Sequence, residues 1–327
     1  MSRTQDIPVE DKSQHAYGIV DTACYVPAER IRLSDMQAEL QISPSELHRL
    51  MDEHELDTIA VETKHNVVEM MEQAANELLT RHWKMADSID CILYTHTFNP
   101  LAPFLYDPLA RIQQRWPLSH VPVQALTQLN CASMDLLFSA ARQRFERTEA
   151  RSILLLAADK MYMPNSRYLQ DSTVSADGAA AVLLSRQQPV NRLLASCVHA
   201  EASVYNSVRS SPERFAWFQQ TFSFGLIKLL RRTAAQAQLD LSQLKWIFPA
   251  NVNEGTWRRV SEGSQLPLER FYFPLLSRIG HAHNADPILN YQHALRKGVL
   301  QDGDYYATLS VGMGSTFGCS IFQHSHH

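Results

Sequence analysis

Residues 126–144 read LTQLNCASMDLLFSAARQR and decide both the fold and the chemistry of this chain. A run rich in β-forming residues, 120–126, leads into a short turn, and Cys131 follows that turn. An amphipathic helix begins next, because apolar side chains recur at helical spacing from 136 to 145. The thiol therefore lies on the first turn of a helix, where free backbone N–H groups and the positive dipole end favour a thiolate. Such a thiolate is a nucleophile, whereas an isolated cysteine is more often a small buried hydrophobe.

The composition excludes several classes of protein. The chain has 327 residues, is 45% hydrophobic and carries a net charge of −4, which supports a large core and argues against broad nucleic-acid binding. Its five cysteines are scattered without a CxxC motif, which suits a reducing cytoplasm and argues against a disulfide framework or a zinc cluster. The first residues lack an apolar leader, and apolar runs stay short of membrane-spanning length. We expect a cytoplasmic protein that does not enter a membrane.

Buried strands alternate with amphipathic helices along the whole chain. The pattern predicts strands near 15–25, 89–96, 120–126, 153–159, 179–185, 192–202, 246–249, 305–311 and 316–323. It predicts helices near 66–82, 108–115, 132–145, 215–237, 253–263 and 287–297. Alternation of this kind indicates an α/β fold with a parallel or mixed sheet. The stretch 187–191, QQPVN, is interpreted as a crossover between two similar halves, 1–186 and 187–327.

Several motifs follow one another in an order that resembles a known family. After the cysteine come ILLLAADK at 153–160, SADGAAAVLL at 175–184, WIFPANVN at 246–253 and GMGSTFG at 312–318. Together they resemble the 3-oxoacyl-[acyl-carrier-protein] synthase III group of the thiolase superfamily. The resemblance implies a thiolase-like αβαβα layered fold, a homodimer and an acyl group carried as a thioester on Cys131. It also implies no permanently bound cofactor, with the phosphopantetheine thioester of an acyl carrier protein, or coenzyme A, as substrate.

Two departures from the family pattern bear on the reaction. Condensing members have a histidine in a PHQAN-like motif, where this chain has Ala250, and an asparagine in a GNTSAA-like loop, where it has the sequence GHAHNADP at 280–287. This second loop resembles the acyltransferase-type offshoot of the family in secondary metabolism. By that resemblance His281 and Asp286 complete a triad with Cys131. The segment that grips coenzyme A is replaced by the acidic stretch 51–64, which favours a carrier-protein donor.

The roles of three residues in this loop stay open at the sequence level. His281 is the expected base, and His283 is an alternative base two residues later. The two histidines have the spacing of metal ligands, but only Asp286 joins them nearby in sequence, so we expect no metal. Asp286 precedes a proline, and capping the following helix is as good an interpretation as orienting His281.

An oxyanion hole and a pocket are also expected. The N–H of Cys131 is one expected oxyanion donor, and the second is expected at Met313 or Gly314 in the glycine-rich turn. Those glycines also suit a tight hairpin. Asn130 and Asn253 are expected to line the pocket, although the asparagine matching Asn253 is usually structural in the family.

The sequence thus predicts a synthase III-like acyltransferase that loads Cys131 from a carrier-protein or coenzyme A thioester and passes the acyl group to a small-molecule acceptor. One alternative is an enzyme that forms a carbon–carbon bond, with or without decarboxylation. Another is a non-catalytic partner subunit of an active synthase, which the loss of a histidine at Ala250 would fit.

Overall fold

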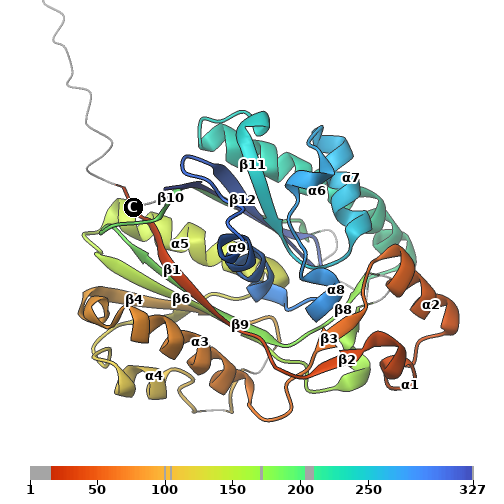
Figure 1. Cartoon of the computed structure of the whole chain (residues 1–327), viewed down its shortest axis with the longest axis horizontal. Coiled ribbons are helices and arrows are strands. Elements are labelled where there is room, and N and C mark those ends of the chain that lie inside the picture. The colour runs from red at the N-terminus through yellow and green to blue at the C-terminus, as the bar shows by residue number, and fades with distance from the viewer. Residues whose placement is uncertain (1–15, 99–100, 104, 170–171, 203–209, 326–327) are drawn as a thin grey trace, which may run out of the picture.

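The computed structural model describes residues 16–98, 101–103, 105–169, 172–202 and 210–325. Helices and strands alternate through the molecule in five layers, in the order helix, strand, helix, strand, helix (Figure 1). This is the αβαβα arrangement that the family resemblance implies. Three hydrophobic clusters fill the space between the layers, one around the central helices and one under each outer helical layer.

The first group of strands comes from the chain before residue 186. It comprises β1 (Gly18–Tyr25), β4 (Ile89–Thr95), β5 (Val123–Ala125), β6 (Ser152–Asp159) and β9 (Gly178–Ser185). β4 is parallel to β5 and β6, whereas β9 runs antiparallel to β6 and β1. β6 and β9 are buried at every position, because helices cover both faces of this group. Their continuous apolar sequences follow from that burial.

The second group of strands comes from the chain after residue 190. It comprises β10 (Asn191–Ala200), β11 (Leu244–Pro249), β12 (Tyr305–Gly312) and β13 (Thr316–His324). β12 and β13 form an antiparallel hairpin, β11 is parallel to β12, and β10 is antiparallel to β13. In the described part of the chain both groups form one hydrogen-bonded order, β11-β12-β13-β10-β1-β9-β6-β4-β5. The groups join where β10 pairs with the start of β1.

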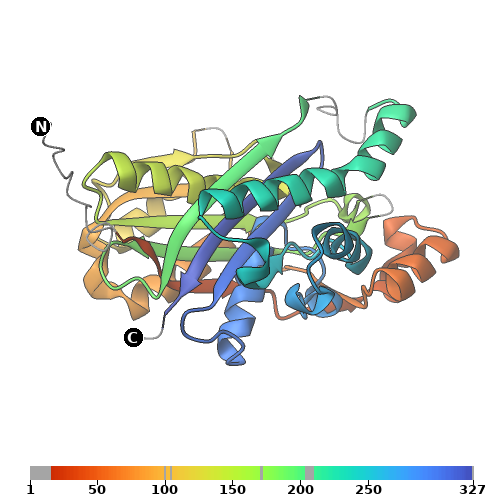
Figure 2. The same cartoon turned by 90° about the horizontal axis from the view of Figure 1, so that it is seen from above.

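The outer helices cover the far faces of the two groups. α3 (Val67–Arg81) and α4 (Ala110–Arg115) lie on the first, and α6 (Pro212–Gln236) and α7 (Glu254–Ser264) lie on the second. Figure 2 shows α6 crossing the strands of the second group. The apolar stripe of α3 was expected, and its start is fixed by a capping box between Asn66 and Glu69.

The middle layer positions the site. It contains α5 (Ser133–Arg147), which packs on β10 and β13, and α9 (Asp286–Arg296), which packs on β11 and β1. Both helices lie between the two groups of strands and belong to the central cluster. Cys131 lies in the short turn just before α5, and Asp286 is the first residue of α9. The expected nucleophile and the expected acid therefore lie at the amino-terminal ends of the two central helices.

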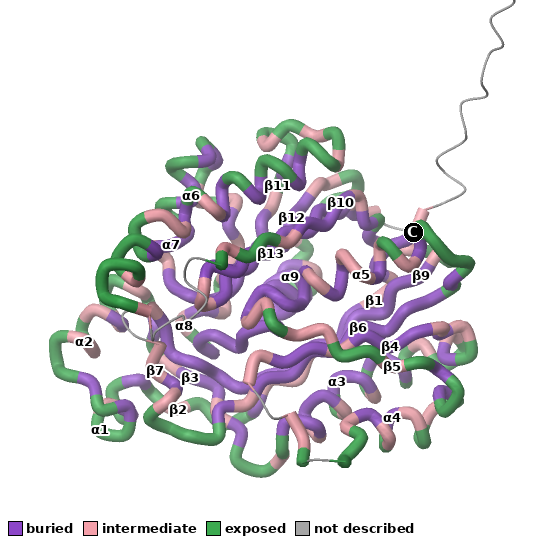
Figure 3. Tube along the Cα trace, turned by 180° about the vertical axis from the view of Figure 1, so that it is seen from behind, coloured by how far each residue is buried: buried purple, intermediate pink, exposed green. Residues whose placement is uncertain are grey.

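A smaller region lies beside the layers. It contains β2 (Arg30–Arg32) paired with β3 (Thr58–Ala60), the pair β7 (Tyr168–Leu169) and β8 (Thr173–Val174), and the short helices α1 (Gln37–Leu40), α2 (Pro44–His48) and α8 (Leu276–Ile279). Figure 3 shows that α1 and α2 are largely exposed, in contrast to the buried strands. The β2–β3 pair was not expected from the sequence, because three-residue strands carry little periodicity.

The described elements lie close to the ranges that their periodicity predicts. The connection between β9 and β10 spans residues 186–190 and contains the boundary placed between 186 and 187. The division into two halves stays a prediction, because β1 and β10 join both groups through backbone pairing. Among the described residues, none of the helices has both the length and the apolar character needed to cross a membrane.

Candidate active site

Cys131 lies in a 3₁₀ turn, Asn130–Ala132, that leads directly into α5. The preceding turn is sharp, because Gln128 and Asn130 both adopt a positive φ, of 75° and 48°. Left-handed backbone is unusual for residues other than glycine and is held only where the surroundings demand it. Here the Asn130 side chain donates to the carbonyl of Met313 at 2.5 Å, which ties this turn to the β12–β13 hairpin. The cysteine, 4% exposed, faces the interior of the molecule.

His281 lies between Cys131 and Asp286. Its Nε2 is 3.3 Å from the Cys131 sulfur, and its Nδ1 is 2.5 Å from a carboxylate oxygen of Asp286. Burial by itself lowers the pKa of His281, but the Asp286 carboxylate and the Cys131 sulfur outweigh it and raise the pKa to about 10. The imidazole is therefore protonated at neutral pH, with one N–H directed at the Asp286 carboxylate and the other at the Cys131 sulfur.

The backbone of His281, in the second half of the chain, is held by hydrogen bonds to a segment of the first half. Its N–H donates to the Val174 carbonyl at 3.1 Å, and its carbonyl accepts from the Ala176 N–H at 2.7 Å. Gly280 has a φ of 73°, and a Cβ there would lie 2.7 Å from a methyl group of Ile59. Only glycine fits this position without strain. The loop from the second half is thus anchored on a segment of the first.

Asp286 is the first residue of α9 and orients the loop rather than capping the helix. No side-chain capping bond is found at the start of α9. Instead the carboxylate accepts from His281, from the Ala282 N–H at 2.8 Å, and from the Asn251 N–H at 2.7 Å and side-chain amide at 3.3 Å. The capping interpretation of Asp286 is therefore wrong. The loop that begins at Gly280 folds back on the carboxylate. The Asp286 side chain therefore bonds to this loop and not to the N–H groups of α9.

Asn251 supports Asp286 from the loop after β11. The side-chain oxygen of Asn251 accepts from the Asn290 amide at 2.8 Å, and the same amide donates to the Pro249 carbonyl at 2.9 Å. Ala250, at the position of the family's histidine, is fully buried, and its carbonyl accepts from the Trp257 indole. The loop after β11 thus supplies hydrogen bonds to Asp286 but no imidazole.

His283 lies on the other side of the sulfur. Its Nδ1 is 3.2 Å from the Cys131 sulfur, and its ring centre is 4.4 Å from that of His281. Its φ of 51° turns the side chain back toward the cysteine, and the edge of Phe98 packs against the ring. Burial, followed by the charges of His281 and Arg167, lowers the pKa of His283 well below its usual range. The two histidines therefore differ: His281 is protonated at neutral pH and His283 is neutral.

Asn284 joins the histidine loop to the cysteine helix. Its side-chain oxygen accepts from the Ser133 and Met134 N–H groups at 2.9 and 3.2 Å, which satisfies free donors at the start of α5. Its amide donates to Asp159 at 3.2 Å and to the Thr97 hydroxyl at 2.9 Å. Burial raises the pKa of Asp159 to about 6, although these donors oppose the rise. One side chain thus fixes the distance between α5 and the loop.

A second buried carboxylate fixes the other side of α5. Asp135, in the first turn, is fully buried and accepts from the hydroxyls of Thr308, Ser310 and Ser320 at 2.6 to 2.8 Å. Burial raises the pKa of Asp135, and the three hydroxyls counteract this. Because these hydroxyls come from β12 and β13, Asp135 locks the cysteine helix onto the hairpin.

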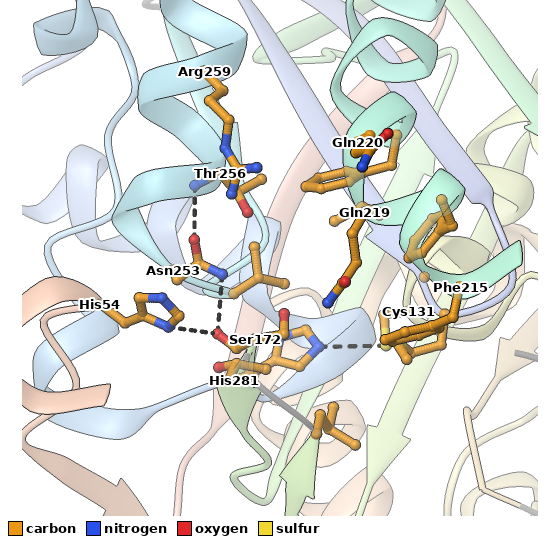
Figure 4. A pocket seen from close by; sticks show the side chains of 18 of the residues that line it. His54, Cys131, Ser172, Phe215, Gln219, Gln220, Asn253, Thr256, Arg259 and His281 are labelled. Carbon is orange, nitrogen blue, oxygen red and sulfur yellow. Dashed lines mark hydrogen bonds between the residues drawn. The ribbon is translucent and has the colours of Figure 1, made fainter. Parts of the chain in front are cut away.

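The sulfur and His281 open onto a cavity of about 430 Å³ (Figure 4). One wall is apolar and is formed by α6 through Phe215, Phe218 and Phe222. The facing wall is polar and includes His54 and Asn253, both of which bond to the Ser172 carbonyl. Asn253 also caps α7 by accepting from the Thr256 N–H at 2.7 Å. Asn253 therefore lines the cavity and also caps α7, whereas Asn130 is not among the described lining residues and bonds to the Met313 carbonyl.

The glycine-rich turn also lies beside the sulfur. Gly312 and Met313 line the cavity, while Gly314, with a φ of 88°, completes the hairpin. A Cβ at Gly312 would lie 2.4 Å from the Thr316 hydroxyl and 2.8 Å from the Leu129 carbonyl. Glycine thus allows the hairpin to approach the turn that carries Cys131. The assignment of Met313 or Gly314 as an oxyanion donor stays a prediction.

A group of metal-ligating atoms is formed by Cys131, His281 and His283. One donor atom from each lies within 4.8 Å of the others, and all three residues are buried. The sequence analysis expected no metal, because only Asp286 joins the two histidines nearby in sequence. The fold supplies a third ligand, the Cys131 sulfur, from 150 residues away.

Sequence reasoning missed the residues that hold the site together. Asp159, Thr97, Asn251 and Asn284 make their contacts across the fold, so spacing along the chain does not reveal them. A signal existed for Asp159 alone. It ends a buried strand at the carboxyl edge of a parallel pair, which is where site residues gather in α/β proteins.

The chain is similar in sequence to known synthase III proteins. A family model described as 3-oxoacyl-[acyl-carrier-protein] synthase III, C terminal, matches residues 234–324. A curated β-ketoacyl-[acyl-carrier-protein] synthase III from Fusobacterium nucleatum is 30% identical over 108 residues, so the match spans about a third of that enzyme. The corresponding synthase III of Aquifex aeolicus is 19% identical over 322 residues, covering 94% of this chain and 99% of the enzyme.

Solved structures of similar proteins have the same fold. A protein described as ChlB3, an acyltransferase, superposes with a TM-score of 0.82 at 19% identity, covering 95% of this chain and 98% of its own. The synthase III structure from Aquifex aeolicus superposes with a TM-score of 0.81 at 17% identity, covering 94% of this chain and all of its own. The predicted thiolase-type fold and the resemblance to the synthase III group are confirmed.

Proposed function

We propose that this synthase III-like protein of the thiolase fold is an acyltransferase that carries an acyl group on Cys131. The observation that supports this proposal is the line of contacts Cys131–His281–Asp286 on the wall of the cavity, with distances of 3.3 and 2.5 Å. A thiol, an imidazole and a carboxylate in this order form an activated nucleophile.

In the first step the Cys131 thiolate attacks the thioester carbonyl of the donor. The carbonyl oxygen becomes an oxyanion, to which the Cys131 N–H and the hairpin at Met313 or Gly314 are the proposed donors. The intermediate collapses, the carbon–sulfur bond to the pantetheine breaks, and the departing thiolate takes the proton from His281. Acylation removes the negative sulfur beside His281, which lowers the pKa of the imidazole and makes it a base for the next step.

In the second step an acceptor hydroxyl or amine enters the cavity. Neutral His281 takes the acceptor proton as the new bond to the acyl carbon forms, and the bond to Cys131 breaks. The protonated imidazole and the thiolate are then restored. Asp286 keeps Nδ1 protonated, so that Nε2 faces the sulfur throughout. His283, neutral at 3.2 Å from the sulfur, is the alternative base.

The donor is proposed to be an acyl carrier protein, with coenzyme A as the alternative source of the same phosphopantetheine arm. Exposed Arg259 lies at the cavity, with its guanidinium 5.6 Å from the Phe222 ring centre, and offers a positive charge to the phosphate of that arm. The family resemblance further suggests a homodimer in the cytoplasm and a role in a biosynthetic pathway. Sedimentation analysis of the purified chain tests the dimer.

Intact-protein mass spectrometry tests the proposal. The chain is incubated with acyl carrier protein and coenzyme A thioesters of several chain lengths, and the product is digested to map the adduct. We expect a mass increase equal to one acyl group on Cys131, and no increase in Cys131→Ala. Buried Cys91 provides a matched control, since Cys91→Ala should still load. Absence of an adduct with any donor would reject the proposal and favour a non-catalytic partner subunit.

A decarboxylating condensation is the second candidate, and Ala250 argues against it. The position is buried and provides no imidazole, whereas condensing relatives, by resemblance, use a histidine there with an asparagine in the next loop. Incubation with a malonyl thioester separates the two reactions. We expect no release of carbon dioxide; release at the rate of acyl loading would favour condensation.

A further inference from the structure

We propose that Cys131, His281 and His283 bind Zn²⁺, and that the bound ion blocks the cysteine reversibly. The Cys131 sulfur lies 3.2 Å from His283 Nδ1 and 3.3 Å from His281 Nε2, and the three donors all lie within 4.8 Å of one another. A sulfur and two imidazole nitrogens that converge in this way form a common ligand set for zinc.

The distances suit a tetrahedral ion. Zinc lies about 2.3 Å from a thiolate and about 2.0 to 2.1 Å from an imidazole nitrogen, so tetrahedral donors are separated by roughly 3.3 to 3.6 Å. The two sulfur–nitrogen separations are already close to this range. The two imidazoles, whose rings are tilted by 47° with centres 4.4 Å apart, have to rotate toward a shared ion.

His281 is already oriented as a zinc ligand. Zinc-binding histidines usually donate their second N–H to a carboxylate, which fixes the ring and its tautomer. The bond from His281 Nδ1 to Asp286 is of this kind, and the carboxylate is itself held by the Asn251 and Ala282 N–H groups. Binding of the ion releases the proton on His281 Nε2 to solvent, because a ligating imidazole nitrogen and a ligating thiolate must both be deprotonated.

His283 is the residue that distinguishes this cluster from a triad. It is 1% exposed, and its Nε2 has no hydrogen-bond partner among the described residues. Its contacts are the edge of Phe98, the ring of His281 and the sulfur. Because Nδ1 is the nitrogen that faces the sulfur, at 3.2 Å, it is the atom through which His283 would bind an ion beside Cys131.

The cavity supplies access and a fourth ligand. Cys131 and His281 both line it, so an ion can enter from solvent and retain a water molecule on the open side. The sulfur that binds zinc is the one that attacks the thioester in the proposed function. A sulfur whose lone pair is bound to zinc cannot at the same time form the bond to the acyl carbon. If Cys131 carries the acyl group as proposed above, zinc occupancy and acylation therefore exclude each other.

Cobalt(II) provides a direct test, because it replaces zinc and gives a thiolate charge-transfer band in the near ultraviolet. The reduced full-length chain, freed of metal by a chelator, is titrated with Co²⁺ and then with Zn²⁺. We expect one Co²⁺ per chain, a thiolate band and its loss on addition of Zn²⁺. The band separates this site from histidines elsewhere, such as the carboxy-terminal HSHH.

Matched variants assign the ligands. Cys131→Ala should abolish the band, and His283→Ala should weaken Co²⁺ binding at least 10-fold, because one of three protein ligands is lost. His54→Ala is the control: His54 lines the same cavity but lies outside the cluster, so its band and affinity should be unchanged. Zn²⁺ should also slow alkylation of Cys131 by iodoacetamide at least 10-fold, and a chelator should restore it.

The outcomes separate the two proposals. Absence of a thiolate band, or a band of unchanged affinity in His283→Ala, would overturn the zinc site whatever the acyl-loading assay gives. A chain that binds Co²⁺ at Cys131 but never accepts an acyl group would reject the proposed function and keep the zinc site.

Discussion

Two loops of the second half supply the polar side chains around Cys131, and they differ from those expected in condensing relatives. By the family resemblance, those relatives have a histidine in the loop after β11, residues 250–253, and an asparagine in the loop before α9, residues 280–285. Here the second loop carries both His281 and Asp286, while the first supplies Asn251 to hold the acid. The same backbone frame therefore supports a different set of reacting groups. The histidine and the acid are therefore local to one loop, five residues apart, while Cys131 comes from the turn before α5.

The largest expected effect comes from removing the imidazole of the second loop. His281→Ala should slow acyl transfer about 10³-fold, because both the proton for the leaving thiol and the base for the acceptor are lost. Single-turnover loading of Cys131, followed by mass spectrometry, measures this. His283→Ala is the matched comparison and should cost less. A larger loss in His283→Ala would transfer the role of base to His283.

The next effect comes from the acid. Asp286→Asn keeps the shape of the side chain but removes its charge, and should reduce the rate about 10²-fold, since His281 loses the partner that fixes its tautomer. Without the carboxylate the pKa of His281 falls. The inflection in the pH–rate profile that reports His281 should therefore lie at a lower pH than in the wild type. Exposed Asp87→Asn provides the control and should be unchanged. A full rate with an unshifted pH profile would assign Asp286 a structural role only.

Most of the fold could be predicted from periodicity, and the reason is burial. Strands such as β6 and β9 are enclosed on both faces, so their sequences are continuously apolar and easy to recognise. The pair β2 and β3 was missed because its strands are short and carry no strong pattern. Cys131, His281 and Asp286 stand out because motifs surround them.

The supporting network could not be predicted in the same way. Asn284 bonds to Ser133 and Asp159, which lie more than 120 residues away in sequence. Neither spacing nor composition shows such contacts, because they depend on how α5 and the loop before α9 are placed by the sheets. The third metal-ligating group was missed for the same reason, since the fold alone brings Cys131 to the two histidines.

A smaller effect is expected in the first loop. Asn251→Ala removes one side-chain bond to Asp286, at 3.3 Å, and leaves the backbone N–H bond at 2.7 Å in place. The rate of acyl loading should fall about 10-fold, consistent with the loss of one hydrogen bond to a charged group. Asn251→Asp should be worse than Asn251→Ala, because two buried carboxylates would then face each other. Equal rates in wild type and both variants would show that the first loop has no part in orienting the acid.

The most gradual effect is on stability. The pKa of His281 is about 10 in the folded chain, against about 6.5 for an unperturbed histidine. Between these values the folded state binds more protons than the unfolded state, so the contribution of His281 is complete below pH 6.5 and declines as pH rises through 10. The slope for a single proton is at most about 1.4 kcal/mol per pH unit. Urea unfolding of wild type and His281→Asn at pH 6.5, 8 and 9.5 measures it. The stability advantage of the wild type should shrink with rising pH, and an advantage that grew would show that His281 is neutral in the folded chain and that the pair with Asp286 carries no extra proton.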